Sequence, residues 1–171
     1  DSTIIGFSHT NFSGTGHADL GDFLLMPTVG DLNLEPFKDK DGKKGFYSTF
    51  SHQSEVATPG FYKVDLDSYK IKAELTASDR VGFHQYTFPQ NDAQVLVDFQ
   101  HGLRFVFEEN DPKALVLESD ITFENDSTIS GYCYTDNWVK RKYFFSLTFD
   151  HPIARTTELP QKANEKAPKY L

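Results

Sequence analysis

Imidazole and carboxylate side chains are the groups in this sequence that could bind a metal ion or transfer a proton. The chain has six histidines and a single cysteine. His9 and His17 enclose a glycine-rich stretch, and with Asp19 and Asp22 nearby they could form a mixed nitrogen and oxygen site. No ligand pair has helix or strand spacing, so bracing of the loop is the favoured interpretation. Cys133 stands between alternating tyrosines and is expected to be a buried strand residue.

Several acidic residues stand beside apolar or aromatic ones, as the acid pair of a glycosidase would. A glycoside hydrolase needs two carboxyl groups across the sugar, about 5 Å apart for retention and about 6.5–9.5 Å for inversion. Sequence spacing does not supply that distance, and each acid taken singly favours a solvated face. These acids are Asp19, Asp22, Glu55, Asp79 and Asp98.

Aromatic rings beside hydroxyls and amides suit a sugar, which stacks its C–H face on a ring. Trp138, in Thr-Asp-Asn-Trp, is the natural candidate, and folding of its ring onto the sheet is an equally simple account. The glycine run lacks the Lys-Ser/Thr of a phosphate loop, so nucleotide binding is not expected. The formal net charge of -8 argues against nucleic acid or an anionic membrane surface as the main partner. No apolar run approaches the roughly 20 residues of a membrane span, and the chain opens with no signal peptide.

Alternation of apolar and polar residues predicts many short strands. Phe23–Met26 is expected to be a buried strand that Pro27 ends or moves to a sheet edge. A hairpin with one dry face is predicted from two apolar rows, Tyr62-Val64-Leu66 and Tyr69-Ile71-Ala73-Leu75. Further strands are expected at 81–88, 95–99, 103–107, 114–117, 121–123, 128–134 and 143–149, with a solvated turn at 38–45.

This pattern predicts an all-β fold with few or no helices, an antiparallel β-sandwich lobe. Residues 1–155 are expected to form the β-sandwich domain. Residues 156–171 have two prolines and alternating charges without an apolar period, and are expected to be a linker or frayed tail.

Four blocks of the sequence closely resemble the signature of the family 92 glycoside hydrolases, the calcium-dependent α-mannosidases. They are Gly6–Gly16 with Asp19–Thr28, the Ser-His-Gln-Ser-Glu block with its Pro-Gly turn at Ser51–Tyr62, Lys72–Ala77 with Arg80–Pro89, and the aromatic strand Tyr143–Phe149. The resemblance extends from Ile4 to about Pro152. One departure is Asn11, which stands where the family pattern has a second histidine.

The resemblance implies a supersandwich-like N-terminal domain packed on a C-terminal (α/α)6 catalytic domain, with the active site between them. It implies an inverting exo-α-mannosidase, commonly acting on α-1,2 linkages of high-mannose glycans, that needs Ca²⁺. Relative to the family, the chain is expected to be truncated at both ends. The catalytic acid, the base and the calcium ligands are then expected outside it, and this chain alone is expected to be inactive. The family also implies a periplasmic or extracellular location.

The resemblance also implies a set of site residues. Phe7, His9, Ser13 and Gly14, supported by His52 and Glu55, are expected to shape the sugar pocket or, as a plainer alternative, to hold the interdomain interface. A rival interpretation of the whole chain is a carbohydrate-binding or adhesive β-sandwich module that has no catalytic partner.

Overall fold

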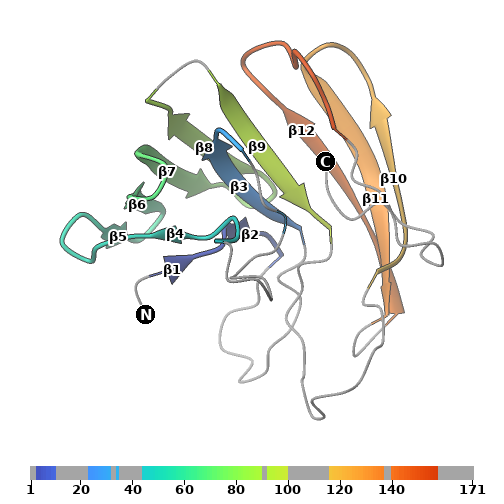
Figure 1. The fold of residues 1–171 in the computed structure, drawn as a ribbon. Coiled ribbons are helices and arrows are strands. Elements are labelled where there is room, and N and C mark those ends of the chain that lie inside the picture. The colour runs from blue at the N-terminus through green and yellow to red at the C-terminus, as the bar shows by residue number, and fades with distance from the viewer. Residues whose placement is uncertain are drawn as a thin grey trace. The chain divides into compact units, whose positions relative to one another are not determined.

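The structure, a computed structural model, describes residues 3–10, 23–31, 34, 44–89, 92–99, 116–136 and 140–157. Within these ranges every regular element is a β-strand (Figure 1). The strands are β1 (Thr3–Ile4), β2 (Phe7–Ser8), β3 (Leu24–Val29), β4 (Ser48–Thr49), β5 (Val56–Thr58), β6 (Phe61–Leu66), β7 (Ile71–Ala77), β8 (Gly82–Thr87), β9 (Ala93–Asp98), β10 (Val116–Phe123), β11 (Thr128–Asp136) and β12 (Lys140–Thr148).

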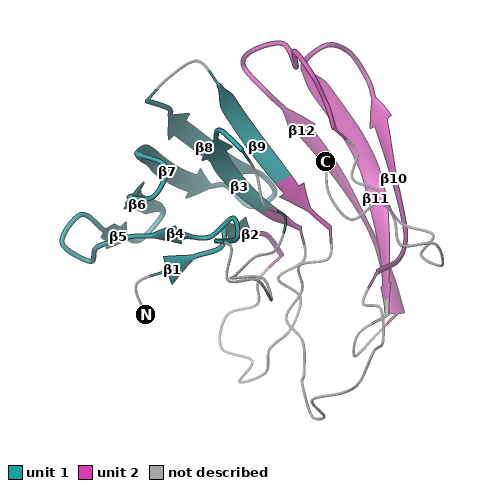
Figure 2. Ribbon diagram, in the orientation of Figure 1, with its two compact units in different colours: residues 1–7, 25–96 teal, residues 8–24, 97–171 magenta. Residues whose placement is uncertain are grey.

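The chain divides into two compact units, which Figure 2 distinguishes by colour. The first contains residues 1–7 and 25–96, and the second contains residues 8–24 and 97–171. The chain passes from one unit to the other inside β2, β3 and β9, which belong to a sheet of order β2-β3-β9. β1 pairs with β4 in a two-stranded sheet.

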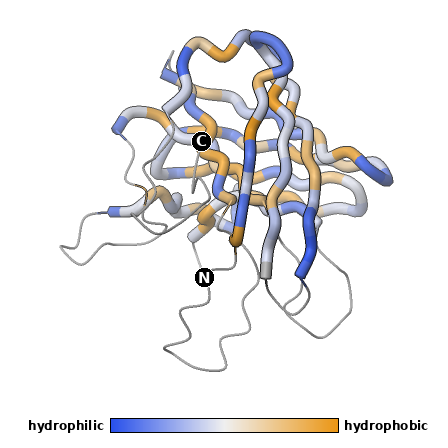
Figure 3. Tube along the Cα trace, turned by 90° about the vertical axis from the view of Figure 1, so that its right-hand side faces the viewer, coloured by the Kyte–Doolittle hydropathy of each residue, from blue (hydrophilic) through white to orange (hydrophobic). Residues whose placement is uncertain are grey.

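The first unit is built on an antiparallel sheet of order β5-β6-β7-β8. β6 and β7 pair Val64 with Ala73 and Leu66 with Ile71, and all four side chains are buried. Lysine and acidic residues alternate with them and form the other face, so polar and apolar stretches alternate along the strands in Figure 3. The predicted hairpin with one dry face is confirmed.

Tyr69 departs from that prediction. It lies in the turn between β6 and β7 rather than in a strand, where its backbone N–H donates to the carbonyl of Leu66 at 3.1 Å. The turn also contains Lys70 at φ 57°, a left-handed conformation that is uncommon for a residue with a Cβ. The phenol of Tyr69 then donates to the carbonyl oxygen of Phe46 at 3.0 Å, which gives this aromatic side chain a partner outside the sheet.

The prediction for Pro27 was wrong. β3 continues through Pro27 to Val29, and it lies between β2 and β9 rather than at an edge. β2 has only two residues and so cannot pair with all six of β3. A position without a backbone donor is tolerated where the neighbouring strand is absent.

The second unit contains an antiparallel sheet of order β10-β11-β12. Along β12 the side chains alternate between exposed and half-buried, the pattern expected for a sheet with one covered face. Cys133 on β11 is fully buried, as predicted. The separate strands expected at 114–117 and 121–123 are one strand in the described residues, because β10 keeps pairing with β11 through a bulge between Val116 and Glu118.

Three phenylalanine rings pack together in the second unit. The ring of Phe23 lies 4.7 Å from that of Phe145 and 5.6 Å from that of Phe99, and these last two are 5.5 Å apart between ring centroids. Phe23 has a φ of 64°, a backbone conformation that bulky residues rarely adopt. Ring packing of this kind stabilises a fold by burying large apolar surfaces, and here it fixes the start of β3.

Some predictions fall outside the described residues. They are the strand at 103–107, most of the turn at 38–45, Trp138, and residues 158–171 of the expected tail. Residues 151–157 are described and have no regular secondary structure.

Candidate functional site

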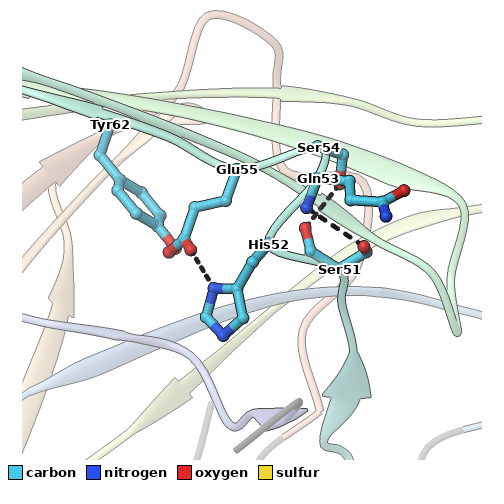
Figure 4. A network of polar contacts seen from close by, with 6 residues as sticks. All are labelled: Ser51, His52, Gln53, Ser54, Glu55 and Tyr62. Atoms are coloured by element: carbon cyan, nitrogen blue, oxygen red, sulfur yellow. Dashed lines mark hydrogen bonds and ion pairs between the residues drawn. The ribbon is translucent and has the colours of Figure 1, made fainter.

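The candidate site in the first unit begins with a tight turn at Ser51–Ser54, shown in Figure 4. The backbone N–H of Ser54 donates to the carbonyl of Ser51 at 3.0 Å, and the Ser54 hydroxyl donates to that same oxygen at 3.0 Å. The Gln53 N–H donates to the Ser51 hydroxyl oxygen at 3.2 Å. Serine side chains stabilise turns in this way, because they accept and donate locally. The turn therefore places His52 and Glu55, three residues apart, on one side.

Glu55 is the centre of a polar cluster. Its Oε1 accepts a hydrogen bond of 2.7 Å from the Tyr62 hydroxyl, and its Oε2 lies 2.5 Å from Nδ1 of His52. Figure 4 shows both partners pointing at the carboxylate. Hydrogen bonds from Tyr62 and then from His52 hold the pKa of Glu55 below its usual range. Burial and the nearby carboxylate raise the pKa of the Tyr62 phenol, so this hydroxyl stays protonated and donates.

The hairpin of β5 and β6 brings Tyr62 to Glu55. Pro59 and Gly60 form the turn between the strands, and Gly60 has a φ of 79°, which glycine adopts at no steric cost. Tyr62 then pairs with Ala57 across the hairpin. Ala57 and Glu55 are two residues apart on the other arm, so their side chains share the face that carries Tyr62.

Phe7 lies against the same face of this sheet. Its ring centroid is 6.4 Å from that of Tyr62, 6.2 Å from that of His84 and 6.3 Å from that of Tyr86. Nδ1 of His84 and the Tyr86 hydroxyl are hydrogen-bonded at 2.6 Å. Burial raises the pKa of Tyr86, so its hydroxyl also stays protonated at neutral pH.

The structure thus brings together three of the predicted site residues, Phe7, His52 and Glu55, around one residue that sequence analysis did not select, Tyr62. His84 and Tyr86 were also missed as site residues. Strand pairing explains why they belong with Phe7, since Leu75 of β7 lies between Tyr62 and His84 in one row across the sheet. The period-two pattern of residues 82–87 was the available signal, because it places His84 and Tyr86 on one face.

His9 belongs to the second unit. Its backbone N–H donates to the carbonyl of Phe23 at 3.2 Å, and its ring meets the Phe23 ring edge-on at 5.9 Å. Burial lowers the pKa of the imidazole, which favours its neutral form at physiological pH. Ser13 and Gly14, the other predicted residues of this loop, lie outside the described residues, as do His17, Asp19 and Asp22.

Side chains of the kinds that commonly bind metals do not cluster in the described residues. No group of three or more His, Cys, Asp or Glu side chains within them is placed to hold a metal ion. Glu55, the carboxylate of the cluster, has both oxygens engaged by Tyr62 and His52, which is the wrong arrangement for an ion that takes six to eight oxygen ligands. In the part of the chain that the structure describes, no helix has the length and apolarity needed to cross a membrane.

A shallow groove of about 430 Å³ lies elsewhere in the first unit. Acidic and basic side chains of the β6–β7 turn and of the strand ends beside it line the groove, together with the residues that follow β8. They include Asp65, Asp67, Lys70, Lys72 and Phe88. Its lining includes none of the predicted site residues.

Comparison with known proteins identifies relatives of this chain. A solved structure of a family GH92 alpha-mannosidase from Bacteroides thetaiotaomicron is 38% identical, with a TM-score of 0.76, and the match covers 90% of this chain and 20% of that one. A structure of that mannosidase in complex with mannoimidazole gives the same identity and TM-score. The match covers 90% of this chain and 19% of that one. An uncharacterized secreted glycosidase from Arthroderma benhamiae is 31% identical over 97 residues, which are 54% of this chain and 12% of that protein.

The chain therefore spans about a fifth or less of the length of these relatives. The predicted fold class, an all-β antiparallel β-sandwich lobe, is confirmed. The model of the glycosyl hydrolase family 92 N-terminal domain matches residues 1–169. With nearly every residue inside that match, the chain belongs to the N-terminal domain family of the family 92 glycosyl hydrolases.

Proposed function

We propose that this chain is the N-terminal β domain of an exo-acting, inverting α-mannosidase. The enzyme removes α-1,2-linked mannose from high-mannose glycans. The observation that carries the proposal is the likeness to the alpha-mannosidase from Bacteroides thetaiotaomicron over 90% of this chain. At 38% identity the likeness extends beyond the fold to the sequence, and the mannoimidazole complex of that relative supports a mannose-shaped ligand.

The domain serves the reaction by shaping a sugar-binding surface rather than by supplying the acid and the base. Glu55 is hydrogen-bonded through both oxygens and its pKa is lowered, so it is a poor proton donor to a glycosidic oxygen. An inverting mechanism needs one protonated and one ionised carboxyl group about 6.5–9.5 Å apart. We place that pair, and the ligands of Ca²⁺, in a C-terminal (α/α)6 domain of the complete protein, which is the direct partner of this one.

The complete protein is proposed to act in the periplasm or outside the cell, where glycans are accessible. Support comes from the relative that is named a secreted glycosidase. The proposed partners of the domain are therefore its own catalytic domain and mannose-containing glycans.

Mannose release from α-1,2-mannobiose tests the proposal. The complete protein should release mannose, lose that activity on addition of a calcium chelator, and regain it with added Ca²⁺. Proton NMR during early turnover should show β-mannose first, as inversion requires. Residues 1–171 alone should release none. Turnover by this chain alone, or no turnover by the complete protein with Ca²⁺, would contradict the proposal.

A further inference from the structure

His52 is exposed and yet held in one orientation. Its side chain is 71% exposed, while its Nδ1 lies 2.5 Å from the Glu55 carboxylate. The ring of Phe50 meets the imidazole edge-on at 5.0 Å between centroids. An exposed side chain usually samples several rotamers, and fixing one of them costs conformational entropy.

The bond between His52 and Glu55 is not what closes the turn. Three hydrogen bonds to Ser51, from Gln53 and Ser54, already close it. Glu55 is itself fixed by the Tyr62 hydroxyl at 2.7 Å, on a strand of the main sheet. The carboxylate is thus a rigid support, and its contact with His52 sets the direction of the imidazole ring.

The support also determines which ring nitrogen carries the proton. An ionised carboxylate only accepts hydrogen bonds, so Nδ1 of His52 must donate to Glu55. In the neutral imidazole the second nitrogen, Nε2, then keeps its lone pair and accepts. Figure 4 shows this nitrogen on the side of the ring away from Glu55. In the neutral form, the outward group is thus a hydrogen-bond acceptor in a fixed position.

We infer that His52 binds the glycan directly, its Nε2 accepting a hydrogen bond from a sugar hydroxyl, with Glu55 and Tyr62 as positioning residues. This rests on the proposed function, which supplies a ligand rich in hydroxyl donors. A neutral sugar also suits a chain of net charge -8 better than an anionic ligand does. Pre-orientation of a binding group raises affinity because less entropy is lost when the ligand binds.

Two substitutions in the complete protein separate binding from support. His52→Asn keeps an N–H group near the place of Nδ1, able to donate to Glu55, but has nothing in the place of Nε2. His52→Gln can put an amide oxygen in the place of Nε2 and lacks the inner donor. For a single lost hydrogen bond, His52→Asn should raise KM for α-1,2-mannobiose about 3- to 10-fold with a smaller change in kcat. His52→Gln should have a KM closer to that of the wild type.

His151 supplies the matched control. It is 85% exposed and its Nδ1 lies 2.9 Å from Asp150, so His151→Asn removes a comparable exposed imidazole and should leave KM unchanged. A KM for His52→Asn equal to that of the wild type, or a lower KM for Asn than for Gln, would overturn the role of His52. An inactive wild-type protein would instead count against the proposed function itself.

Discussion

Gly131 of β11 lies directly opposite Phe145 of β12, and the phenylalanine ring occupies the space where a side chain at residue 131 would be. A Cβ at this position would be 2.8 Å from Cζ of Phe145 and 2.1 Å from the backbone carbonyl oxygen of Asp120 on β10. The ring is in turn packed against Phe23 and Phe99. The glycine therefore allows the aromatic cluster of the second unit to lie close to the sheet.

Gly131→Ala should destabilise the fold strongly, because relief of the contact requires movement of β10 backbone and not only of a side chain. We expect a loss of about 2–3 kcal/mol in the free energy of unfolding, typical of overpacking. Denaturant unfolding followed by circular dichroism measures it. Ser146→Ala, beside Phe145 on the exposed face of β12, is the control and should change stability little. Equal stabilities for the two variants would contradict this account.

The hydrogen bond from Tyr62 to Glu55 should make the free energy of unfolding depend on pH in the acidic range. The pKa of Glu55 is lowered in the folded chain, so between that value and its usual value near 4.5 the unfolded chain binds more protons. The stabilisation is thus complete above about pH 4.5 and is lost as the pH falls through the folded-state pKa. Tyr62→Phe removes the first cause of the shift. Its deficit in stability relative to the wild type should therefore be larger at pH 7 than at pH 3.

Tyr69→Phe is the matched control for that measurement. The Tyr69 hydroxyl donates to a backbone carbonyl, which does not titrate, so its loss should produce the same deficit at both pH values. Parallel behaviour of Tyr62→Phe and Tyr69→Phe would show that Glu55 does not depend on Tyr62.

His9 should destabilise the fold in mild acid. Burial lowers its pKa, so below about pH 6.5 the unfolded chain takes up a proton that the folded chain resists. The free energy of unfolding then decreases as the pH falls, until the folded-state pKa is passed. As the pH is lowered from 8 to 5, the free energy of unfolding of His9→Gln should therefore rise relative to that of the wild type. Denaturant unfolding at each pH measures this difference.

For His151, we expect the stability of the variant relative to the wild type to change with pH in the opposite direction. Asp150 raises the pKa of this imidazole, so its contribution is present below about pH 6.5 and is lost as the pH rises through the folded-state value. As the pH is lowered from 8 to 5, the free energy of unfolding of His151→Gln should fall relative to that of the wild type. The same sign of change in both variants would refute the assignments.

The role expected for His9 in the sugar pocket needs a kinetic test in the complete enzyme. His9→Ala should lower kcat/KM for α-1,2-mannobiose about 3- to 10-fold if the residue shapes the pocket. Thermal unfolding of the same variant separates the alternatives. Unchanged catalysis with a lower unfolding temperature would mean that His9 only holds the interdomain interface.

Alternation of apolar and polar residues was enough to predict β6, β7 and β8 of the first unit. Val64 and Ala73 lie in rows that only a hairpin with one dry face explains, and the structure pairs them. The same reasoning was wrong at Tyr69, because an apolar residue in a turn fits a period of two as well as a strand residue does. The separate expectation that Pro27 would end the strand or move it to an edge was also wrong, because whether a strand tolerates proline depends on the length of its neighbour.

Phe7, His52 and Glu55 were selected as site residues through the resemblance of their sequence blocks, and among them only the contact between His52 and Glu55 follows from closeness in sequence. His52 and Glu55 are three residues apart, so their contact needs only a turn. Tyr62 and His84 joined the cluster through pairing across β6, β7 and β8, and register between strands is not visible in residue spacing. Phe7 reaches the same rings from a strand far from them in sequence.

The Pro59-Gly60 turn has a consequence for which changes of length this domain tolerates. β6 is held in place by β7, so an extra residue in the turn would displace β5 by one position against Tyr62. Glu55 would then face the opposite side of the sheet, and His52 would lose its support. Insertions accumulate readily in most surface loops, but in a functional domain of this kind the interval of seven residues from Glu55 to Tyr62 should stay fixed.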